Sequence, residues 1–309
     1  MNKNIPQVQV LMSTFNGAKY IEEQIESIMF QKNVETSLLI RDDGSTDNTI
    51  NIIQRLMCKF PGRIELTSGK NIGYRKSFLQ LFSLIGKYDY YAFADQDDFW
   101  IEDKLIRGVS SLQSDVTLGL YSSSLTLTDE NLDIIGYKRY KNFNKSFKSF
   151  FVRTRLAGCT YVFVPEIAEV MKKFHDINAM HTEMPDHDML VCLVCILMKK
   201  NIFIDQNSYI LHRRLSTSET AGGGVKKRVK VEWKRIFNRK YSYQTTVKLL
   251  SNELYEIDFE KKYLVFFDRV LKSNNSLVAR LRLIFDYELS SKNILADILI
   301  RVKILLGYY

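Results

Sequence analysis

Residues 90–98 read Tyr-Tyr-Ala-Phe-Ala-Asp-Gln-Asp-Asp, an apolar run that ends in three carboxylates within four positions. A short apolar run bounded by polar residues is typical of a buried strand. Carboxylates this close repel one another, and a divalent cation relieves the repulsion. Mg²⁺ or Mn²⁺ would take one or two of these oxygen ligands and leave the rest of its coordination to phosphate and water. The stretch therefore predicts a strand that ends in a metal and phosphate site.

The same alternation of apolar runs and helical periodicity extends outward from this stretch. The sequence predicts strands over 8–12, 37–41, 64–67 and 90–94, and helices over 20–30, 49–60, 74–85 and 103–113. Strands separated by helices of this length form a parallel sheet with helices on both faces. Residues 118–213 mix strands and helices, so we expect an α/β fold with a mixed, mainly parallel sheet.

Polar residues follow three of the predicted strands. They are Ser13–Gly17, Asp42–Asp47 and Asp95–Asp98. Ligands of such sheets bind at the carboxyl ends of the strands, which makes these segments the expected site. Asp42–Ser45 also has a plain structural explanation, because Asp, Gly and Ser form turns and Thr46 or Asp47 would cap the next helix.

Four segments in this order resemble a known family. They read Val10-Leu-Met-Ser-Thr-Phe-Asn-Gly17, Arg41-Asp-Asp-Gly-Ser-Thr-Asp47, Asn71-Ile-Gly73 and Ala94-Asp-Gln-Asp-Asp-Phe-Trp100. The pattern resembles the family 2 glycosyltransferases, over roughly residues 6–220. The resemblance implies a GT-A fold, a nucleotide-sugar donor and inversion at the anomeric carbon.

The resemblance also implies roles for single residues. Asp43 corresponds to the carboxylate that contacts a pyrimidine base, Asp95 to the ribose-side member of the D-x-D motif, and Asp97 to the metal ligand. Asp98 would start the next helix or support its neighbours. The nucleotide-sugar site would comprise Thr14, Phe15, Asn16, Asp43, Asn71, Gly73, Asp95 and Gln96.

The catalytic base is expected downstream, in Pro185-Asp-His-Asp188. Transfer with inversion needs a carboxylate that takes the proton of the acceptor hydroxyl, and we assign this role to Asp188. Asp186 is the competing candidate, although it could be only the N-cap of the helix. His187 is expected to support the site through hydrogen bonds.

One departure from the family concerns the metal. Relatives often carry Tyr-Arg-x-His after the last sheet strand, with the His as a further ligand, whereas this chain reads Leu211-His-Arg-Arg-Leu215. Leu215 takes the place of that His, and His212 could substitute only if the backbone shifts. Arg213 and Arg214 could neutralise the diphosphate directly. Residues 216–224 are expected to form a lid over the donor.

Charge and composition divide the chain at its glycine cluster. Residues 222–309 hold 18 Lys and Arg against 9 Asp and Glu, which equals the whole net charge of +9. We expect a GT-A domain over 1–220, with a nucleotide-sugar half over about 1–115 and an acceptor half over about 116–220, and a basic helical region over 221–309. Its helices at 276–287 and 294–306 suit either an anionic membrane surface or packing on the main domain.

The remaining features concern the compartment. No leader sequence or membrane-spanning stretch is recognised. The four cysteines are sparse, and the Cys192 and Cys195 pair, which lies in an apolar run, is expected to be part of the core rather than a zinc or redox site. These features predict a cytoplasmic protein, with possible attachment to the inner face of the cell membrane.

The sequence thus predicts a glycosyltransferase that uses Mg²⁺ or Mn²⁺ and adds a sugar to a lipid-linked or growing cell-surface glycan. The overall pattern is similar to bacterial rhamnosyltransferases, which favours dTDP-L-rhamnose as donor. UDP-linked hexoses and N-acetylhexosamines stay open. The alternative is a non-catalytic nucleotide or nucleic-acid binder, but the acidic segments after the strands would repel a polyanion, so no nucleic-acid partner is expected.

Overall fold

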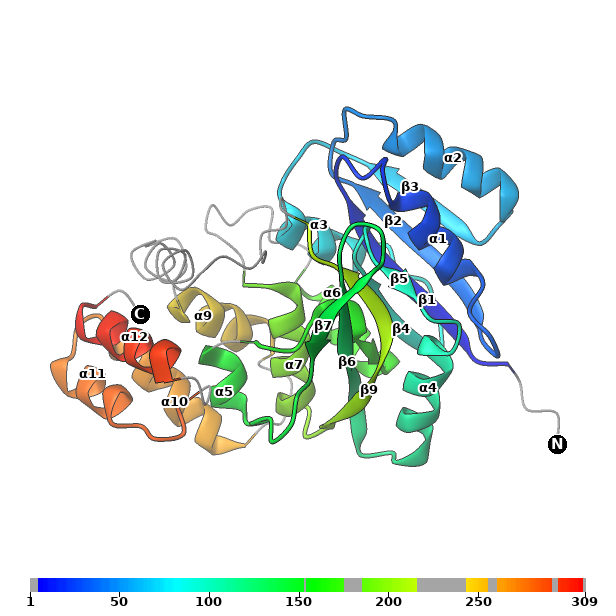
Figure 1. The fold of residues 1–309 in the computed structure, drawn as a ribbon. Helices are drawn as coiled ribbons and strands as arrows, with labels where there is room; N and C mark the ends of the chain where they lie inside the picture. Colours follow the sequence, from blue (N-terminus) through cyan, green and yellow to red (C-terminus); the bar gives the residue numbers. More distant parts are fainter. Residues whose placement is uncertain are drawn as a thin grey trace. The chain divides into compact units, whose positions relative to one another are not determined.

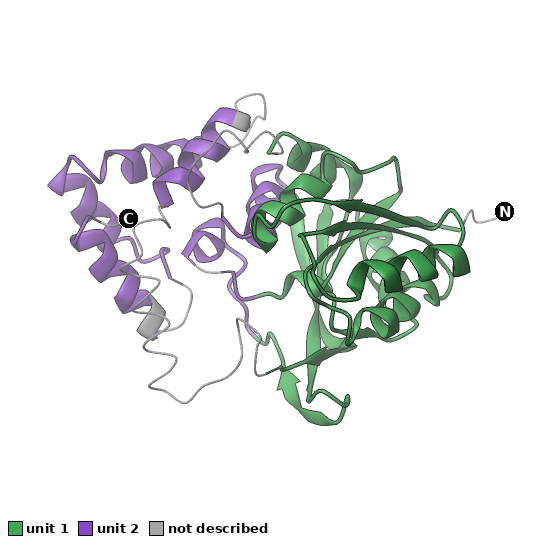
Figure 2. Ribbon diagram, turned by 90° about the horizontal axis from the view of Figure 1, so that it is seen from above, with its two compact units in different colours: residues 1–141, 156–175, 200–219 green, residues 142–155, 176–199, 220–309 purple. Residues whose placement is uncertain are grey.

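The computed structural model describes residues 5–152, 154–174, 185–215, 243–254, 260–290 and 294–307. The chain forms two compact units, coloured separately in Figure 2. The first comprises residues 1–141, 156–175 and 200–219. The second comprises residues 142–155, 176–199 and 220–309, so it takes two segments from the predicted first domain besides the C-terminal region.

The first unit is an α/β structure (Figure 1). Its strands are β1 (Gln7–Thr14), β2 (Glu35–Asp42), β3 (Ile64–Ser68), β4 (Tyr90–Ala94), β5 (Phe99–Trp100), β6 (Leu118–Thr128), β7 (Ile134–Lys138), β8 (Val162–Phe163) and β9 (Asn201–Arg213). Its helices are α1 (Ile21–Met29), α2 (Thr49–Lys59), α3 (Tyr74–Leu81), α4 (Lys104–Ser114), η1 (Gly158–Thr160) and α6 (Pro165–Lys172).

One mixed sheet runs through the first unit. Within the described residues its strand order is β3-β2-β1-β4-β8-β6-β9-β5, and β7 pairs with β6. The neighbours β3, β2, β1 and β4 are parallel, as are β6 and β9. The pairs of β8 with β4 and β6, and of β5 with β9, are antiparallel. The predicted mixed, mainly parallel sheet is confirmed.

Helices cover both faces of this sheet. Alternate residues of β1, such as Val8 and Val10, face a core shared with α1, α2 and α4. On the other face, the ring of Phe93 in β4 packs against Phe78 of α3 and against Phe82, the C-cap residue of this helix, with centroids 5.5 and 5.9 Å apart. The alternation follows from the two-residue period of a strand. Because helices cover both faces of the sheet, polar side chains gather at the ends of the strands.

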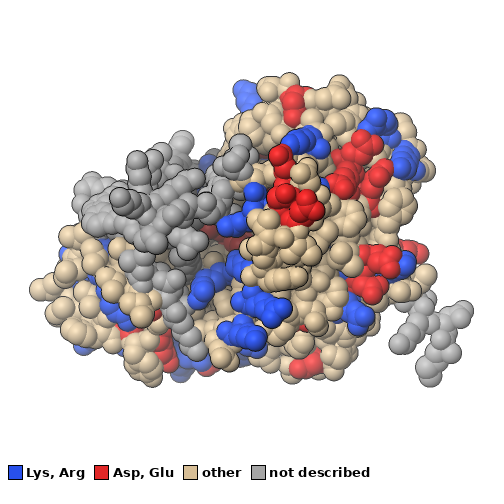
Figure 3. Space-filling model, in the orientation of Figure 1, with Lys and Arg blue, Asp and Glu red and all other residues tan. Residues whose placement is uncertain are grey.

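Acidic and basic side chains lie close together on the face of the first unit shown in Figure 3. Several form exposed ion pairs, including Arg55 with Glu22 and Lys59 with Glu26. Such pairs contribute little to stability, typically about 0–1 kcal/mol. They agree with the balanced charge of this part of the sequence.

The second unit is helical. Its elements are α5 (Phe147–Val152), α7 (His187–Leu197), α9 (Tyr243–Glu253), α10 (Lys261–Lys272), α11 (Leu277–Ile284) and α12 (Ile294–Leu305). Its core is aromatic, and the Phe147 ring lies 4.8 Å from that of Tyr263. The predicted helical C-terminal region is confirmed in its described parts. The lid expected over 216–224 lies outside the described residues. The helices of the described chain are all too short or too polar to cross a bilayer.

Candidate donor-binding and metal site

The loops after β2, β1 and β4 are neighbours, because these three strands are adjacent and parallel. Thr14 and Asp42, the last residues of β1 and β2, are almost fully buried, and the Thr14 hydroxyl donates to Oδ2 of Asp42 over 3.0 Å. Oδ1 of Asp42 accepts from the backbone N–H groups of Gly44 and Ser45, at 3.1 and 2.8 Å. Asp42 therefore shapes the turn, as expected for this residue type.

Asn16 joins the first loop to the second. Its backbone N–H donates to the Ser45 hydroxyl over 2.9 Å, and its Oδ1 accepts from the backbone N–H of Thr46 over 2.8 Å. The backbone at Asn16 has φ of 49°, a conformation that Asn tolerates better than most residues. The backbone N–H of Gly17 donates to the Thr49 hydroxyl. These reciprocal bonds hold both loops in one conformation.

Gln96 joins the first loop to the acidic run. Its Oε1 accepts from the backbone N–H of Phe15 over 2.9 Å, and its Nε2 donates to the carbonyl of the same residue over 3.1 Å. Phe15 keeps its ring exposed, with 44% of its surface accessible. The polar atoms of Gln96 are thus engaged by protein backbone, whereas the aromatic ring stays available to a ligand.

The three carboxylates of the acidic run differ in burial. Asp98 is fully buried, and Asp95 and Asp97 are half-buried. Burial, together with repulsion from Asp98 and Asp97, raises the pKa of Asp95 to about 7. Burial and the Asp98 charge raise the pKa of Asp97 to about 6. The carboxylates of the run thus repel one another and ionise less readily, and a bound cation would relieve this repulsion.

His212 lies beside the acidic run. Phe99 of β5 pairs with Leu211 of β9, and this pairing places Nδ1 of His212 2.8 Å from Oδ1 of Asp98. Burial alone would lower the pKa of His212, but the carboxylates of Asp98, Asp95 and Asp97 raise it to about 9. A hydrogen-bonded carboxylate on one ring nitrogen is the usual way to orient a metal-binding histidine.

The donor set suits a hard divalent cation. Among the described residues, ligand atoms of Asp95, Asp98, Cys159 and His212 lie within 4.8 Å of one another. Asp98 Oδ2 is buried and has no hydrogen-bond partner in this part of the chain. Burial raises the pKa of Cys159 far above its usual value, so the thiol stays protonated and is a poor ligand. Asp97 is not part of this group of atoms, although its charge interacts with Asp98 and His212.

Arg213 and Arg214 differ in their surroundings. Arg213 is buried, donates to the carbonyls of Glu130 and Asp97 at 3.2 and 2.8 Å, and pairs with the Glu23 carboxylate. Its guanidinium group therefore braces the acidic run. Arg214 is half-buried, and its backbone N–H continues the pairing with β6 through the carbonyl of Thr128.

Two buried groups beneath the acidic run were missed in the sequence. Lys104 is fully buried, with Nζ 3.6 Å from the centroid of the Trp100 ring. Burial lowers the pKa of Lys104 to about 7. Residues 104, 108 and 112 share one face of α4, so a lysine on an otherwise apolar face was the available signal. Cys159 is the second of these groups, and a single cysteine in the sequence gives no signal of its place beside the acidic run.

The remaining predicted residues lie at two other places. Asn71 is exposed, and its Oδ1 accepts from the backbone N–H of Gly73, which begins α3. Asp186 and Asp188 lie at the start of α7, in the second unit. Asp186 is the N-cap residue, and Oδ1 of Asp188 accepts from the backbone N–H of Met189. His187 is buried.

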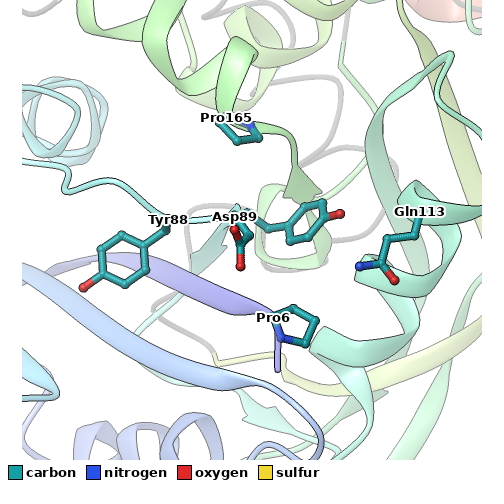
Figure 4. Close-up of a pocket in the computed structure, with 6 residues that line it drawn as sticks. Pro6, Tyr88, Asp89, Gln113 and Pro165 are labelled. Carbon is teal, nitrogen blue, oxygen red and sulfur yellow. The ribbon is translucent and has the colours of Figure 1, made fainter. Parts of the chain in front are cut away.

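A pocket of about 360 Å³ lies near the amino ends of β1 and β4 (Figure 4). Its lining comprises Pro6, Tyr88, Asp89, Tyr90, Gln113 and Pro165. Gln113 lies near the end of α4, and the other five residues precede or begin β1, β4 and α6, whereas the acidic run follows β4. The Asp89 carboxylate accepts from the backbone N–H of Gln7 and so connects the start of β1 to the residue before β4. This pocket is separate from the loops described above.

Comparisons with known proteins agree with this geometry. The family model of glycosyl transferase family 2 matches residues 9–170. The dTDP-rhamnosyl transferase RfbG of Shigella flexneri is 30% identical over 257 residues, which cover 80% of this chain and 86% of the relative.

Two solved structures share the fold. TarS 1–349 of S. aureus, in complex with UDP-GlcNAc, matches with a TM-score of 0.55 at 16% identity, over 98% of this chain and 89% of TarS 1–349. The mannosyltransferase PcManGT of Pyrobaculum calidifontis, in complex with GDP-Man and Mn²⁺, matches with a TM-score of 0.51 at 15% identity, over 99% and 81% of the two chains. With its GT-A-like fold, this chain is a glycosyltransferase that belongs to glycosyl transferase family 2.

Proposed function

We propose that this enzyme transfers a sugar, with inversion, from a pyrimidine nucleoside diphosphate to a hydroxyl of a lipid-linked or growing cell-surface glycan. The observation that carries the proposal is the interlocking of three strand-end loops around the acidic run, through Asn16, Gln96 and Asp42. A site whose loops are fixed before the ligand arrives loses little energy to reorganisation. The sequence relationship to RfbG supports the same reaction class.

The donor binds along these loops. Thr14, Phe15 and Asn16 form the floor of the nucleotide site, and Asp43, Asn71 and Gly73 its base side. Asp95 and Gln96 lie on the ribose side. The exposed Phe15 ring gives an apolar surface for the nucleoside.

The diphosphate is balanced by positive charge. In this proposal Asp97 and His212 would hold Mg²⁺ or Mn²⁺, and Asp95 and Asp98, whose ligand atoms lie within 4.8 Å of that of His212, would supply further oxygen ligands. The ion would orient the diphosphate and neutralise charge on it. The fit of a cation is supported by the buried Asp98 oxygen without a partner and by the raised pKa values of Asp95 and Asp97. Of the two arginines, Arg214 contacts the phosphates, because the guanidinium nitrogens of Arg213 already bind protein groups.

Asp188 is the proposed base. It takes the proton of the acceptor hydroxyl while that oxygen attacks the anomeric carbon, and the bond from this carbon to the diphosphate oxygen breaks on the opposite face. Asp186 acts through its N-cap position, and His187, which is buried, supports the helix start. The acceptor is bound by variable segments, which we place in 129–155 and in the C-terminal region.

The donor is dTDP-L-rhamnose in this proposal, following RfbG. A UDP-linked hexose or N-acetylhexosamine is the alternative, since TarS shares the fold and was crystallised with UDP-GlcNAc. Nucleotide binding without catalysis, or nucleic-acid binding, has less support, because the acidic strand-end loops would repel a polyanion.

We also propose that the enzyme works at the cytoplasmic face of the cell membrane, bound through its C-terminal helices. On α11, exposed apolar residues follow helical spacing at Leu277, Leu281 and Phe285. On α12 they recur at 294, 298, 302 and 305. The basic charge of this region favours anionic lipid.

The test is a donor screen. Purified enzyme is mixed with an acceptor extract and with dTDP-rhamnose, UDP-glucose, UDP-galactose, UDP-GlcNAc or GDP-mannose, with Mn²⁺, Mg²⁺ or EDTA. Release of the nucleoside diphosphate is measured for each. The proposal expects dTDP release from dTDP-rhamnose that needs the cation. Release from a UDP-sugar alone would transfer the assignment to the alternative donor.

A further inference from the structure

A buried guanidinium group lies at the carboxyl end of β2. Arg41 is only 5% exposed, and the residues that precede it in β2, such as Leu38 and Ile40, are buried and apolar. It donates to Oδ1 of Asp43 over 2.6 Å, to the Ser77 hydroxyl over 3.0 Å and to Oε1 of Gln80 over 2.7 Å. A further bond of 3.2 Å reaches the carbonyl of Lys70. One side chain thus connects β2, α3 and the loop between β3 and α3.

Asp43 extends this network along the same loop. It is 2% exposed, and its Oδ1 also accepts from the backbone N–H of Ile72 over 2.9 Å. Its Oδ2 accepts from the backbone N–H of Gly73 over 2.9 Å. The Asp43 carboxylate therefore accepts hydrogen bonds both from Arg41 and from the loop backbone.

The loop follows the guanidinium closely. A Cβ on Gly69 would lie 3.0 Å from one terminal nitrogen of Arg41, so a side chain there would require the guanidinium group or the loop to shift by a few tenths of an ångström. Gly73 has φ of 83°, which residues other than glycine rarely adopt. The network thus fixes residues 69–73, an irregular segment, in a conformation that its own backbone bonding would not specify.

Stability alone is a weak reason for such a network. A buried ion pair loses so much hydration that apolar residues of similar size often stabilise a fold as well or better. The cost is easier to understand where the pair positions a segment that must keep one shape. Residues 69–73 lie at the carboxyl edge of parallel strands, where ligands of these sheets bind. The Ser77 hydroxyl also accepts from Ser13 at the end of β1, over 2.5 Å, which links this network to the first loop.

We propose that Arg41 is a positioning residue for donor binding: with Asp43 it fixes residues 69–73 as the wall of the nucleobase site. Asp43 then helps to hold this loop, besides the contact with the base that the family resemblance implies for its carboxylate. The inference rests on the proposed function, because it requires a nucleotide donor. It adds Arg41, to which no role was assigned above, and gives Asp43 a second role.

The test compares Arg41→Lys and Arg41→Gln with Arg63→Lys as a matched control. Arg63 is a partly buried arginine near the start of β3, and it donates to the carbonyls of Thr36 and Met29 at 3.0 and 3.1 Å. It therefore has a similar structural role at the opposite end of these strands, away from the proposed donor site. Binding of dTDP, UDP and GDP to the full chain is measured by calorimetry, and kcat and KM are measured with the donor found active.

We expect Arg41→Lys to weaken binding of the preferred pyrimidine diphosphate about tenfold, as for loss of a charged buried hydrogen bond, and Arg41→Gln to weaken it more. The preference over GDP falls, and KM rises while kcat at saturating donor stays within about twofold. Arg63→Lys leaves all of these values unchanged. A folded Arg41→Lys variant with wild-type affinity and base preference would overturn the proposal.

Hydrogen exchange gives a second measurement that does not need a stable Arg41→Gln variant. In Arg41→Lys, the backbone N–H groups of Ile72 and Gly73 should exchange faster than in the wild type, while the strand amides of β2 keep their protection. Unchanged exchange at both positions would also overturn the proposal. If the wild type binds no nucleoside diphosphate at all, the proposed function fails instead, and the exchange result still reports on the network.

Discussion

The strand-end loops of the first unit and the helices α10 to α12 of the second unit use polar and apolar residues in opposite ways. In the loops, polar groups such as Thr14, Asp42 and Asp98 are buried and most are hydrogen-bonded to one another. On the helices, large apolar residues such as Leu277 and Phe285 are exposed. The first arrangement suits chemistry that needs fixed charges, and the second suits association with an apolar surface. We therefore expect substitutions in the two regions to separate donor chemistry from membrane attachment.

The largest effect is expected at the proposed base. Asp188→Asn should lower kcat about 10³-fold, because general-base catalysis supplies about 10²–10⁴-fold, while donor affinity stays unchanged. Initial rates and calorimetric donor binding check this together. Asp186→Asn is the control, with an expected loss below about tenfold. Retained turnover in Asp188→Asn, with loss in Asp186→Asn, would move the role to Asp186.

Asp97→Asn should have the next largest effect. The substitution weakens the site of the cation that neutralises the departing diphosphate, and loss of one such stabilising interaction typically costs about 10²-fold in rate. The substitution should also remove the Mn²⁺ dependence of nucleotide binding. Asp103→Asn is the control, because Asp103 lies on the surface and forms an exposed pair with Arg107 at 3.7 Å. Equal Mn²⁺ dependence in Asp97→Asn and the wild type would exclude Asp97 as a ligand.

The affinity for Mn²⁺ should depend on pH. The pKa of Asp97 is raised to about 6, that of Asp95 to about 7 and that of His212 to about 9. Each must lose its proton before it can bind a cation, so lowering the pH from 8 to 6 should weaken Mn²⁺ binding by roughly tenfold or more.

The same shifts fix the sign for stability. The folded form of each group binds protons more tightly than the unfolded form, so their contribution to stability in the absence of metal decreases as the pH rises: from about 4 to 7 for the two carboxyl groups and from about 6.5 to 9 for His212. Mn²⁺ titrations and thermal unfolding at pH 5, 6, 7 and 8 measure both quantities. A pH-independent affinity would contradict this electrostatic picture.

The smallest effect concerns the second unit. Replacing Leu277, Leu281 and Phe285 together by serine should weaken binding to vesicles of anionic phospholipid about fivefold, because the apolar area that enters the lipid is reduced. Donor turnover in solution should not change. The control is the double substitution of Ile134 and Ile135, exposed apolar residues of the first unit. Equal vesicle binding by all three proteins would argue against attachment through α11.

The sequence predicted the sheet because its signals were local. Strand 90–94 has the predicted bounds, and β1, β2 and β3 extend the predicted strands by one or two residues at one or both ends. Residues 201–213, in the region predicted to mix strands and helices, form one long strand, β9, whose pairing with β6 continues past polar residues through shifts in register. The short strand β5 carries too little periodicity to be recognised, yet it brings His212 to Asp98.

For the candidate site, the sequence indicated which residues to consider but not which hydrogen bonds they form. Local motifs pointed to Asp43, Asp95 and Gln96 as candidates. No pattern could show that Gln96 binds the backbone of Phe15 or that Arg213 binds the carbonyl of Asp97. These contacts join residues more than 80 positions apart, and they depend on strand order. Arg41 was visible as a charge in an apolar strand, but its partners depend on how α3 packs.

The central claim, sugar transfer at the acidic run, is tested most directly by nucleoside diphosphate release from dTDP-rhamnose and UDP-sugars, compared between the wild type and Asp97→Asn. The proposal predicts release that requires Mn²⁺ or Mg²⁺ together with an acceptor and that falls about 10²-fold in the variant. Absence of release from every donor, with nucleotide binding unchanged by Asp97→Asn, would contradict it.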